Sequence, residues 1–159
     1  MAALGRAQVV TVSDRSHAGV REDSSGPLLA ALLVELGLEV APVLVVPDEV
    51  VAISQAVRAG AASHELVVTT GGTGLSPRDV TPEAVRPLLD REIPGLGEAL
   101  RQQGRDLLPT TILSRSLAGS IGRTLVVTLP GSTGGVRDGV RVLAPVLAHA
   151  LAQLRGGDH

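Results

Sequence analysis

Hydrophobic and polar positions follow two different periods along this chain. Short runs rich in β-branched residues predict buried strands, at 7–13, 39–46, 65–70 and 124–128. Apolar residues spaced three and four apart predict helices, at 28–36, 49–61, 81–91, 97–105 and 136–154. Because strands and helices alternate through short connections, the pattern indicates an α/β fold with a mostly parallel sheet and right-handed crossovers.

Proline and glycine support several of these boundaries. The first helix has Pro27 near its start and Gly37 after its end, and Pro82 takes the first position of a helix for which Thr81 is the expected N-cap. Pro145 predicts a kink in the closing helix. With no repeat and no linker, we expect a single domain over 1–159 with its core at about 7–154 and a frayed tail.

Composition then removes several classes of partner. The formal net charge is -2, so no basic surplus attracts nucleic acid or an anionic membrane surface. The first residues lack the pattern of a secretory signal, and no apolar run reaches the roughly 20 residues that cross a bilayer. We therefore expect a cytoplasmic protein with neither a nucleic-acid nor a membrane partner.

The residues that the chain lacks restrict its chemistry further. It contains no Cys and no Lys, which excludes thiolate nucleophiles, Schiff bases and the lysine of a P-loop. It also has no aromatic residue, so a bound base would be held by peptide planes, aliphatic side chains or an Arg guanidinium. The histidines are scattered without metal-ligand spacing and receive no chemical role.

Polar or glycine-rich groups follow four of the predicted strand segments. In an open parallel sheet, ligands bind at the carboxyl ends of the strands. The groups expected there are Ser13 and Asp14 after the first strand, Asp48 after the second, 71–79 after the third, and Gly131 and Ser132 after the last. We expect these groups to surround one binding site.

The glycine-rich segment Gly71-Gly72-Thr73-Gly74 is a candidate phosphate cradle. Glycines allow positive φ angles and a close approach of backbone N–H groups to an anion. The segment matches neither the dinucleotide fingerprint nor the Walker motif. A tight turn without a ligand explains these four residues equally well when they are considered alone.

Asp48 and Asp79 are the candidate metal ligands and catalytic carboxylates. Each has a structural alternative, since Asp48 could cap a helix and Asp79 could order a turn. Together, beside a glycine-rich loop, they form an oxygen-only site suited to Mg²⁺ bound with substrate phosphates. Arg78 and Arg115 are the nearest basic residues and could contact phosphate or lie at the surface.

Five sequence strings resemble the MogA/MoaB family of molybdenum-cofactor biosynthesis proteins, which includes a domain of gephyrin. They are TVSDR at 11–15, TTGGTG at 69–74, RDVTPEA at 78–84, LSRS at 113–116 and LPGS at 129–132. The resemblance extends over about 7–150. Family members often have Pro two residues after the glycine of the last string, where this chain has Thr133.

The resemblance implies a three-layer α/β/α sandwich of the MogA-like, molybdopterin-binding type, usually a homotrimer. It implies an Mg²⁺-dependent adenylyltransferase that joins AMP from ATP to molybdopterin, releases pyrophosphate and passes the product to a MoeA-type partner. Asp48 and Asp79 would be catalytic and metal-binding. Ser13, Asp14 and 71–74 would bind the nucleotide, and molybdopterin would contact Thr70, Ser114, Arg115, Pro130, Gly131 and Ser132.

Two alternatives to the enzyme stay open at this stage. Some MoaB-like members share these strings without being active adenylyltransferases, so the chain could be a non-catalytic molybdopterin-binding or carrier protein. The same domain is also found fused in larger proteins, where it could act as an assembly module.

Overall fold

The computed structural model describes residues 2–157 and contains one seven-stranded sheet. The strands are β1 (Gly5–Val12), β2 (Leu38–Val40), β3 (Leu44–Val46), β4 (Leu66–Thr70), β5 (Arg91–Glu92), β6 (Ala118–Ile121) and β7 (Thr124–Leu129). The α-helices are α1 (Asp14–His17), α2 (Ser25–Glu35), α3 (Val50–Ser63), α4 (Thr81–Val85), α5 (Pro94–Gln102) and α6 (Thr133–Leu154). Two 3₁₀ helices, η1 (Arg86–Leu88) and η2 (Pro109–Leu113), complete the elements.

Most of the sheet is parallel, as predicted. The order is β2-β1-β4-β7-β6-β5, and β3 also pairs with β1. β1 is parallel to β2, β3 and β4, and β4 is parallel to β7. β6 is antiparallel to both of its neighbours, β5 and β7. The carboxyl ends of β1, β3, β4 and β7 therefore meet at one edge of the sheet.

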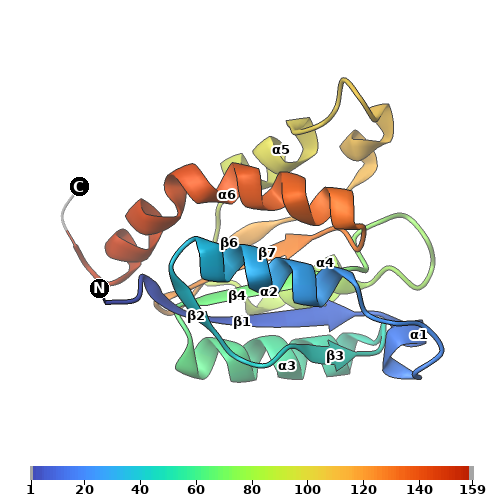
Figure 1. Cartoon of the computed structure of the whole chain (residues 1–159), viewed down its shortest axis with the longest axis horizontal. Helices are drawn as coiled ribbons and strands as arrows, with labels where there is room; N and C mark the ends of the chain where they lie inside the picture. The colour runs from blue at the N-terminus through green and yellow to red at the C-terminus, as the bar shows by residue number, and fades with distance from the viewer. Residues whose placement is uncertain (1, 158–159) are drawn as a thin grey trace.

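Helices cover both faces of the sheet (Figure 1). One buried cluster packs α2 and α6 against alternate residues of the central strands, including Val9, Val68 and Val127. The other packs α3 and α4 against the intervening residues, including Val10, Val67 and Val126. This two-residue alternation is that of a sheet buried on both sides. The predicted three-layer α/β/α sandwich is confirmed.

The predicted strand at 39–46 is divided in the structure. β2 and β3 pair with different parts of β1, and Pro42 lies in the gap between them. Proline has no N–H to donate to a strand ladder. The carbonyl of Pro42 instead accepts a hydrogen bond from the side-chain amide of Gln8 at 2.9 Å. The single-strand prediction is wrong for this reason.

The predicted helix at 81–91 begins at Thr81 as expected, but its N-cap and its end differ from the prediction. Val80 is the N-cap, while Thr81 lies inside α4 and its hydroxyl donates to the carbonyl of Gly71 at 2.9 Å. The helix tightens into η1 and stops at Leu88, because Pro87 cannot supply the N–H that α-helical continuation needs. Arg91 and Glu92 then form the edge strand β5.

Other boundaries differ less. The first strand ends at Val12, and Ser13 caps the short helix α1. α5 begins three residues earlier than predicted, with Pro94 at its start, and ends at Gln102. β6 was not predicted at all. α6 begins at Thr133 and continues through Pro145 to Leu154. Among residues 2–157, no helix is both long and apolar enough to span a membrane.

Candidate functional site

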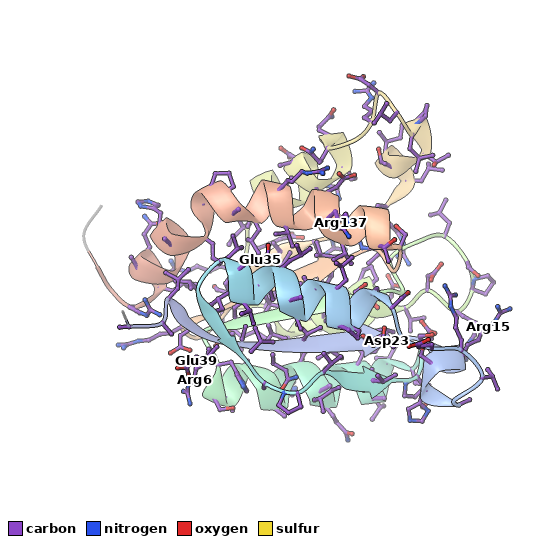
Figure 2. The ribbon with its side chains drawn as sticks, viewed as in Figure 1. Arg6, Arg15, Asp23, Glu35, Glu39 and Arg137 are labelled. Carbon is purple, nitrogen blue, oxygen red and sulfur yellow. The ribbon has the colours of Figure 1, made fainter. Side chains whose placement is uncertain are left out.

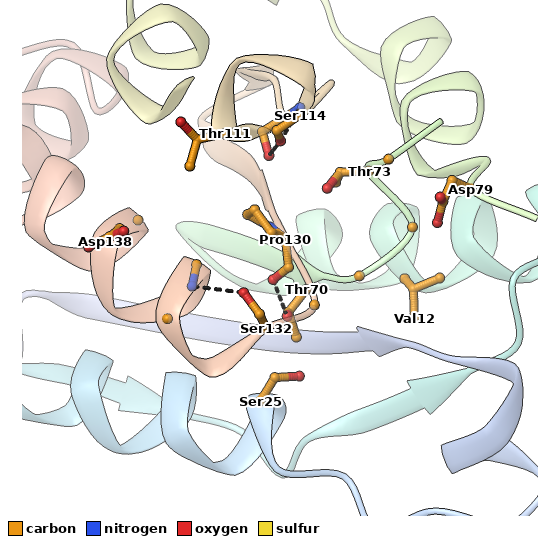
Figure 3. A pocket seen from close by; sticks show the side chains of 18 of the residues that line it. Val12, Ser25, Thr70, Thr73, Asp79, Thr111, Ser114, Pro130, Ser132 and Asp138 are labelled. Carbon is orange, nitrogen blue, oxygen red and sulfur yellow. Dashed lines mark hydrogen bonds between the residues drawn. The ribbon is translucent and has the colours of Figure 1, made fainter. Parts of the chain in front are cut away.

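A cavity of about 930 Å³ lies at the carboxyl ends of the parallel strands. Twelve predicted site residues line it: Ser13, Asp48, Thr70, Gly71, Gly72, Thr73, Gly74, Asp79, Ser114, Pro130, Gly131 and Ser132. Figure 3 shows Asp79 and Thr73 on one side, Ser114 and Thr111 above, and Pro130 and Ser132 in the centre. Asp14 and Arg115 do not line the cavity, and each holds neighbouring groups in place.

The loop after β4 requires its first two glycines. Gly71 and Gly72 have φ angles of 104° and 71°, which L side chains rarely adopt. A Cβ on Gly71 would strike the carbonyl oxygen of Val12, and one on Gly72 would strike the hydroxyl of Thr81. The amide of Thr81 also donates to the carbonyl of Gly72 at 3.0 Å. The glycines thus let this loop pass close to β1 and to α4.

Asp48 is held at the end of β3 by a reciprocal contact with Asp14. The amide of Asp14 donates to Oδ2 of Asp48 at 2.9 Å, and the amide of Asp48 donates to Oδ1 of Asp14 at 2.9 Å. The hydroxyl of Ser13 accepts from the amide of Ser16 at 3.1 Å and caps α1. These contacts join the ends of β1 and β3, so the Asp48 carboxylate is fixed by backbone groups.

The pKa values of Asp14 and Asp48 are shifted in opposite directions. Burial raises the pKa of Asp48 above its ordinary value, and the neighbouring carboxylates of Asp14 and Asp79 raise it further. The amide of Asp48 lowers the pKa of Asp14, and the guanidinium of Arg78 lowers it as well. Asp48 is therefore a partly desolvated carboxylate that a divalent cation would stabilise in its charged form.

Asp79 closes the loop that follows the glycines. Its Oδ2 accepts a hydrogen bond from the amide of Ser76 at 3.0 Å. A Cβ on Gly74 would lie 2.8 Å from the same oxygen, so this position has no room for a side chain. The adjacent Arg78 donates through Nε and Nη2 to the two carboxylate oxygens of Asp14, at 3.0 Å each. Arg78 thereby ties the loop of Asp79 to the residue that holds Asp48.

Arg115 clamps the same loop from the other side. Its guanidinium donates to the carbonyls of Gly74 at 2.9 Å and Asp79 at 2.8 Å, and to Oε2 of Glu83 at 2.7 Å. The Arg115 amide donates to the carbonyl of Thr73 at 2.8 Å. The Arg115 contact lowers the pKa of Glu83, and Glu83 raises the pKa of Arg115. With these contacts, Arg115 supports the cavity wall without lining the cavity.

The amino end of α6 forms another wall. Ser132 caps the helix by accepting the amide of Gly135 at 3.0 Å, and the hydroxyl of Thr70 donates to the carbonyl of Pro130 at 2.8 Å (Figure 3). A Cβ on Gly131 would lie 3.2 Å from the Cα of Gly71, so the β4 and β7 loops touch. A helix amino end and a glycine-rich loop in one cavity are both suited to bind phosphate.

The cavity offers two carboxylates for Mg²⁺ rather than a complete set of protein ligands. Within residues 2–157, no group of three or more His, Cys, Asp or Glu side chains could hold a metal ion. Asp48 and Asp79 both line the cavity, and Oδ2 of each accepts a backbone hydrogen bond while Oδ1 is left for a ligand. Mg²⁺ often takes one or two carboxylates and completes its coordination with water and substrate phosphate. The residues present match that pattern.

Several cavity residues were missed from the sequence. Asp23 accepts from the hydroxyl of Thr11 at 2.7 Å and from the amide of Gly26 at 3.0 Å, which orders the segment before α2. In the view of Figure 2, Asp23 and Arg15 lie toward one end of the molecule, and Arg6 and Glu39 lie toward the other. Asp138 and Arg141, one helical turn apart on α6, pair at 3.0 Å. The available signal was their position just before a helix or in its first three turns.

Comparison with known proteins gives consistent matches over nearly the whole chain. The family described as "Probable molybdopterin binding domain" matches residues 8–149. A molybdenum cofactor biosynthesis bifunctional protein of Synechococcus elongatus is 46% identical over 154 residues, covering 96% of this chain and 48% of that protein. The chain thus spans about half the length of that relative.

Two further relatives match along almost their full lengths. A molybdopterin adenylyltransferase of Pyrococcus furiosus is 39% identical over 155 residues, covering 92% of this chain and 89% of that protein. The crystal structure of a molybdopterin biosynthesis protein from Mycobacterium abscessus superposes with a TM-score of 0.91 and 45% identity, covering 96% of this chain and 98% of that one.

Proposed function

Because this chain belongs to the molybdenum-cofactor biosynthesis family defined by the probable molybdopterin binding domain, we propose that it adenylylates molybdopterin with ATP and Mg²⁺. The observation that carries this proposal is the shared cavity, in which Asp48 and Asp79 lie beside the glycine-rich loop 71–74. The relative from Pyrococcus furiosus that is named for this activity supports the proposal.

The reaction is a transfer of the adenylyl group without a covalent enzyme intermediate. A terminal phosphate oxygen of molybdopterin attacks the α-phosphorus of ATP, a new P–O bond forms, the bond to the bridging oxygen breaks, and pyrophosphate leaves. The chain has no Cys or Lys to act as a nucleophile. Such a transfer depends mainly on positioning and on neutralising phosphate charge.

The chain's own residues supply the positioning. Backbone N–H groups of 72–74 and of the first turn of α6 would bind phosphate oxygens, with Ser13 among the nucleotide contacts. The amide of Gly71 donates to the carbonyl of Leu129 at 2.9 Å, so Gly71 would contribute through the shape of the loop. Thr70, Ser114 and Ser132 would offer hydroxyl groups to molybdopterin. Arg115 and Asp14 act one step away, because they hold the loops that carry Asp79 and Asp48.

Asp48 and Asp79 would hold the Mg²⁺ ion. When bound, Mg²⁺ supplies charge neutralisation for the phosphates in the transition state. The raised pKa of Asp48 supports this assignment, since a partly desolvated carboxylate gains most from a neighbouring cation.

We further propose a cytoplasmic homotrimer that passes adenylylated molybdopterin to a MoeA-type metal-insertion protein. These proposals rest on the resemblance to the MogA/MoaB family. Sedimentation equilibrium of the purified chain checks the trimer, and transfer of labelled product to a purified MoeA-type protein checks the hand-over.

The test of the main proposal is a direct assay with molybdopterin, Mg²⁺ and α-labelled ATP. We expect Mg²⁺-dependent adenylylated pterin and one pyrophosphate for each transfer. Binding of molybdopterin without ATP consumption would identify a carrier instead. Assembly without affinity for either compound would identify a scaffold.

A further inference from the structure

Large apolar side chains gather, exposed, at the rim of the cavity. Leu75, Leu107, Leu108 and Leu113 all line the cavity and are exposed to solvent. Leu107 is 93% exposed and Leu75 is 68% exposed, so neither is packed into the core. Exposed apolar groups that converge on a concave site are typical of ligand contacts. Their position at the rim therefore calls for an apolar group of the ligand.

The segment that carries Leu107 and Leu108 is attached loosely to the rest of the fold. Within the described residues, the hydrogen bonds of 103–113 end at 99–114, such as those from the amides of Leu107 and Leu108 to the carbonyl of Gly104 at 3.1 and 2.9 Å. Figure 1 shows this segment rising beyond α5, away from the sheet. Such a segment can adjust to a ligand at little cost in broken hydrogen bonds.

Leu75 extends from the opposite, firmly held loop. It follows Gly74, whose carbonyl accepts from Arg115 at 2.9 Å. The amide of Arg115 donates to the carbonyl of Thr73, so the chain that leaves 103–113 returns directly beside this loop. Leucines from a fixed loop and from a weakly attached segment therefore line the same cavity.

The absence of aromatic residues gives these leucines a specific purpose. No Phe, Tyr or Trp exists anywhere in the chain, so a flat ring cannot stack on an aromatic side chain. Both substrates of the proposed reaction carry a fused-ring heterocycle, adenine or pterin, and each includes a planar pyrimidine ring. Aliphatic side chains cover such a ring by removing its faces and their own surface from water.

We propose that Leu75 and Leu107, assisted by Leu108, form an aliphatic clamp that encloses the fused ring system of a bound substrate. The inference rests on the proposed function, because that function supplies the ring. The polar end of the cavity binds phosphates, and the leucine rim binds the ring. The leucines should therefore give ring-bearing ligands a higher affinity than a polyphosphate without a ring.

Calorimetric titration tests the clamp with ATP, molybdopterin and tripolyphosphate, which has charge but no ring. The variants are Leu107→Ala and Leu75→Ala, with Ile112→Ala as the matched control. Ile112 is exposed in the same segment but does not line the cavity. We expect about 10-fold weaker binding of the clamped ligand in both leucine variants, unchanged tripolyphosphate binding, and wild-type behaviour in the control.

The arms of the experiment separate the possible results. Weaker binding of ATP alone assigns the clamp to adenine, and weaker binding of molybdopterin alone assigns it to the pterin. Equal loss for tripolyphosphate, or no loss for either ring ligand, overturns the clamp while the proposed function stands. If the leucine variants change the molar mass of the protein in solution but not its affinity for either ring ligand, the rim is a contact between copies of the chain. That result also overturns the clamp. Wild-type protein that binds no ring ligand overturns both proposals.

Discussion

Two walls of the same cavity are built in opposite ways. The polar wall, which carries Asp48 and Asp79, is cross-linked by hydrogen bonds between segments far apart in the sequence, including Arg78 with Asp14 and Arg115 with Gly74. The apolar wall at 103–113 bonds only to nearby residues within the described chain and exposes its leucines.

The two proposals assign a different task to each wall. Groups that stabilise charge act best when they are already oriented, because reorientation during the reaction would cost energy. Groups that cover a flat ring need only approach it, and ligand binding can supply the free energy of that adjustment. We therefore expect substitutions in the polar wall to lower turnover, and substitutions in the apolar wall to weaken binding.

The largest effect is expected from the carboxylates themselves. Asp48→Asn and Asp79→Asn keep the side-chain size and a carbonyl oxygen for the backbone contacts, but remove the charge. We expect kcat/KM for adenylylation to fall by about 10²–10³-fold in each, with little change in the free energy of unfolding. Asp90→Asn is the control, because Asp90 accepts from the amide of Gly122 outside the cavity lining. Full activity in either site variant would contradict the assignment.

A smaller effect is expected when the loop clamp is removed. Arg115→Ala deprives the carbonyls of Gly74 and Asp79 of their donor and leaves Glu83 unpaired. We expect about 10- to 100-fold lower kcat and about 1–3 kcal/mol lower unfolding free energy, measured by steady-state kinetics and urea unfolding. Arg115→Lys should recover only part of this loss, because one ammonium group cannot reproduce the planar fork.

The control for that substitution is Arg86→Ala. It breaks an exposed ion pair with Glu92, 3.2 Å long and away from the cavity lining. We expect Arg86→Ala to lower the unfolding free energy by less than about 1 kcal/mol and to leave kcat unchanged. Equal effects of the two alanine variants on kcat would show that the Arg115 contacts do not orient the loop for catalysis.

The exposed bridge between Arg78 and Asp14 should matter less than Arg115. Both side chains are largely solvated, at 62% and 41% exposure, so water replaces much of what Arg78→Ala removes. We expect Arg78→Ala to lower kcat several-fold and to lower the unfolding free energy by less than about 1 kcal/mol. The difference between wild-type protein and the variant should shrink at high salt, because salt screens the ion pair. A loss of kcat as large as that of Arg115→Ala would mean that the loop of Asp79 depends equally on the Arg78 and Arg115 contacts.

Much of this polar wall was predictable from the sequence. The four strand ends were predicted from β-branched runs, and their meeting followed from the geometry of parallel sheets. Asp48, Asp79 and the glycine-rich loop were therefore placed together, as the structure has them. Asp14 and Arg115 were expected to touch ligand, and the structure shows them holding loops, a distinction that depends on side-chain direction.

The apolar wall was not predicted, and the reason is physical. The residues 106–116, after the predicted helix, show no regular spacing of apolar positions, and their leucines resemble those of any short turn. β6, with the sequence AGSI, lacks the β-branched run that marks a buried strand, and its place depends on pairing with β7. Long-range pairing and exposure are properties of the folded chain, so local patterns carried no signal for them.

The smallest predicted effect concerns the ion pair that orients Arg115. The contact between Glu83 and Arg115 lowers the pKa of Glu83 below its ordinary value. The folded state therefore binds the Glu83 proton less tightly than the unfolded chain does. The stabilisation is complete above the unfolded pKa and is lost as pH falls through the lowered folded pKa. Relative to Glu83→Gln, wild-type protein should be more stable by less than about 1 kcal/mol at pH 7, because both partners are partly exposed.

Urea unfolding of wild-type protein and Glu83→Gln across the acidic range measures this difference. The two unfolding free energies should converge as the pH falls below the lowered pKa, and kcat at pH 7 should differ little, since the contacts from Arg115 to Gly74 and Asp79 remain. A stability gap that persists at low pH would show that Glu83 acts through packing. A loss of kcat as large as that of Arg115→Ala would show that the polar wall depends on the ion pair itself, because the carbonyl contacts alone would then be too weak to hold the loop of Asp79.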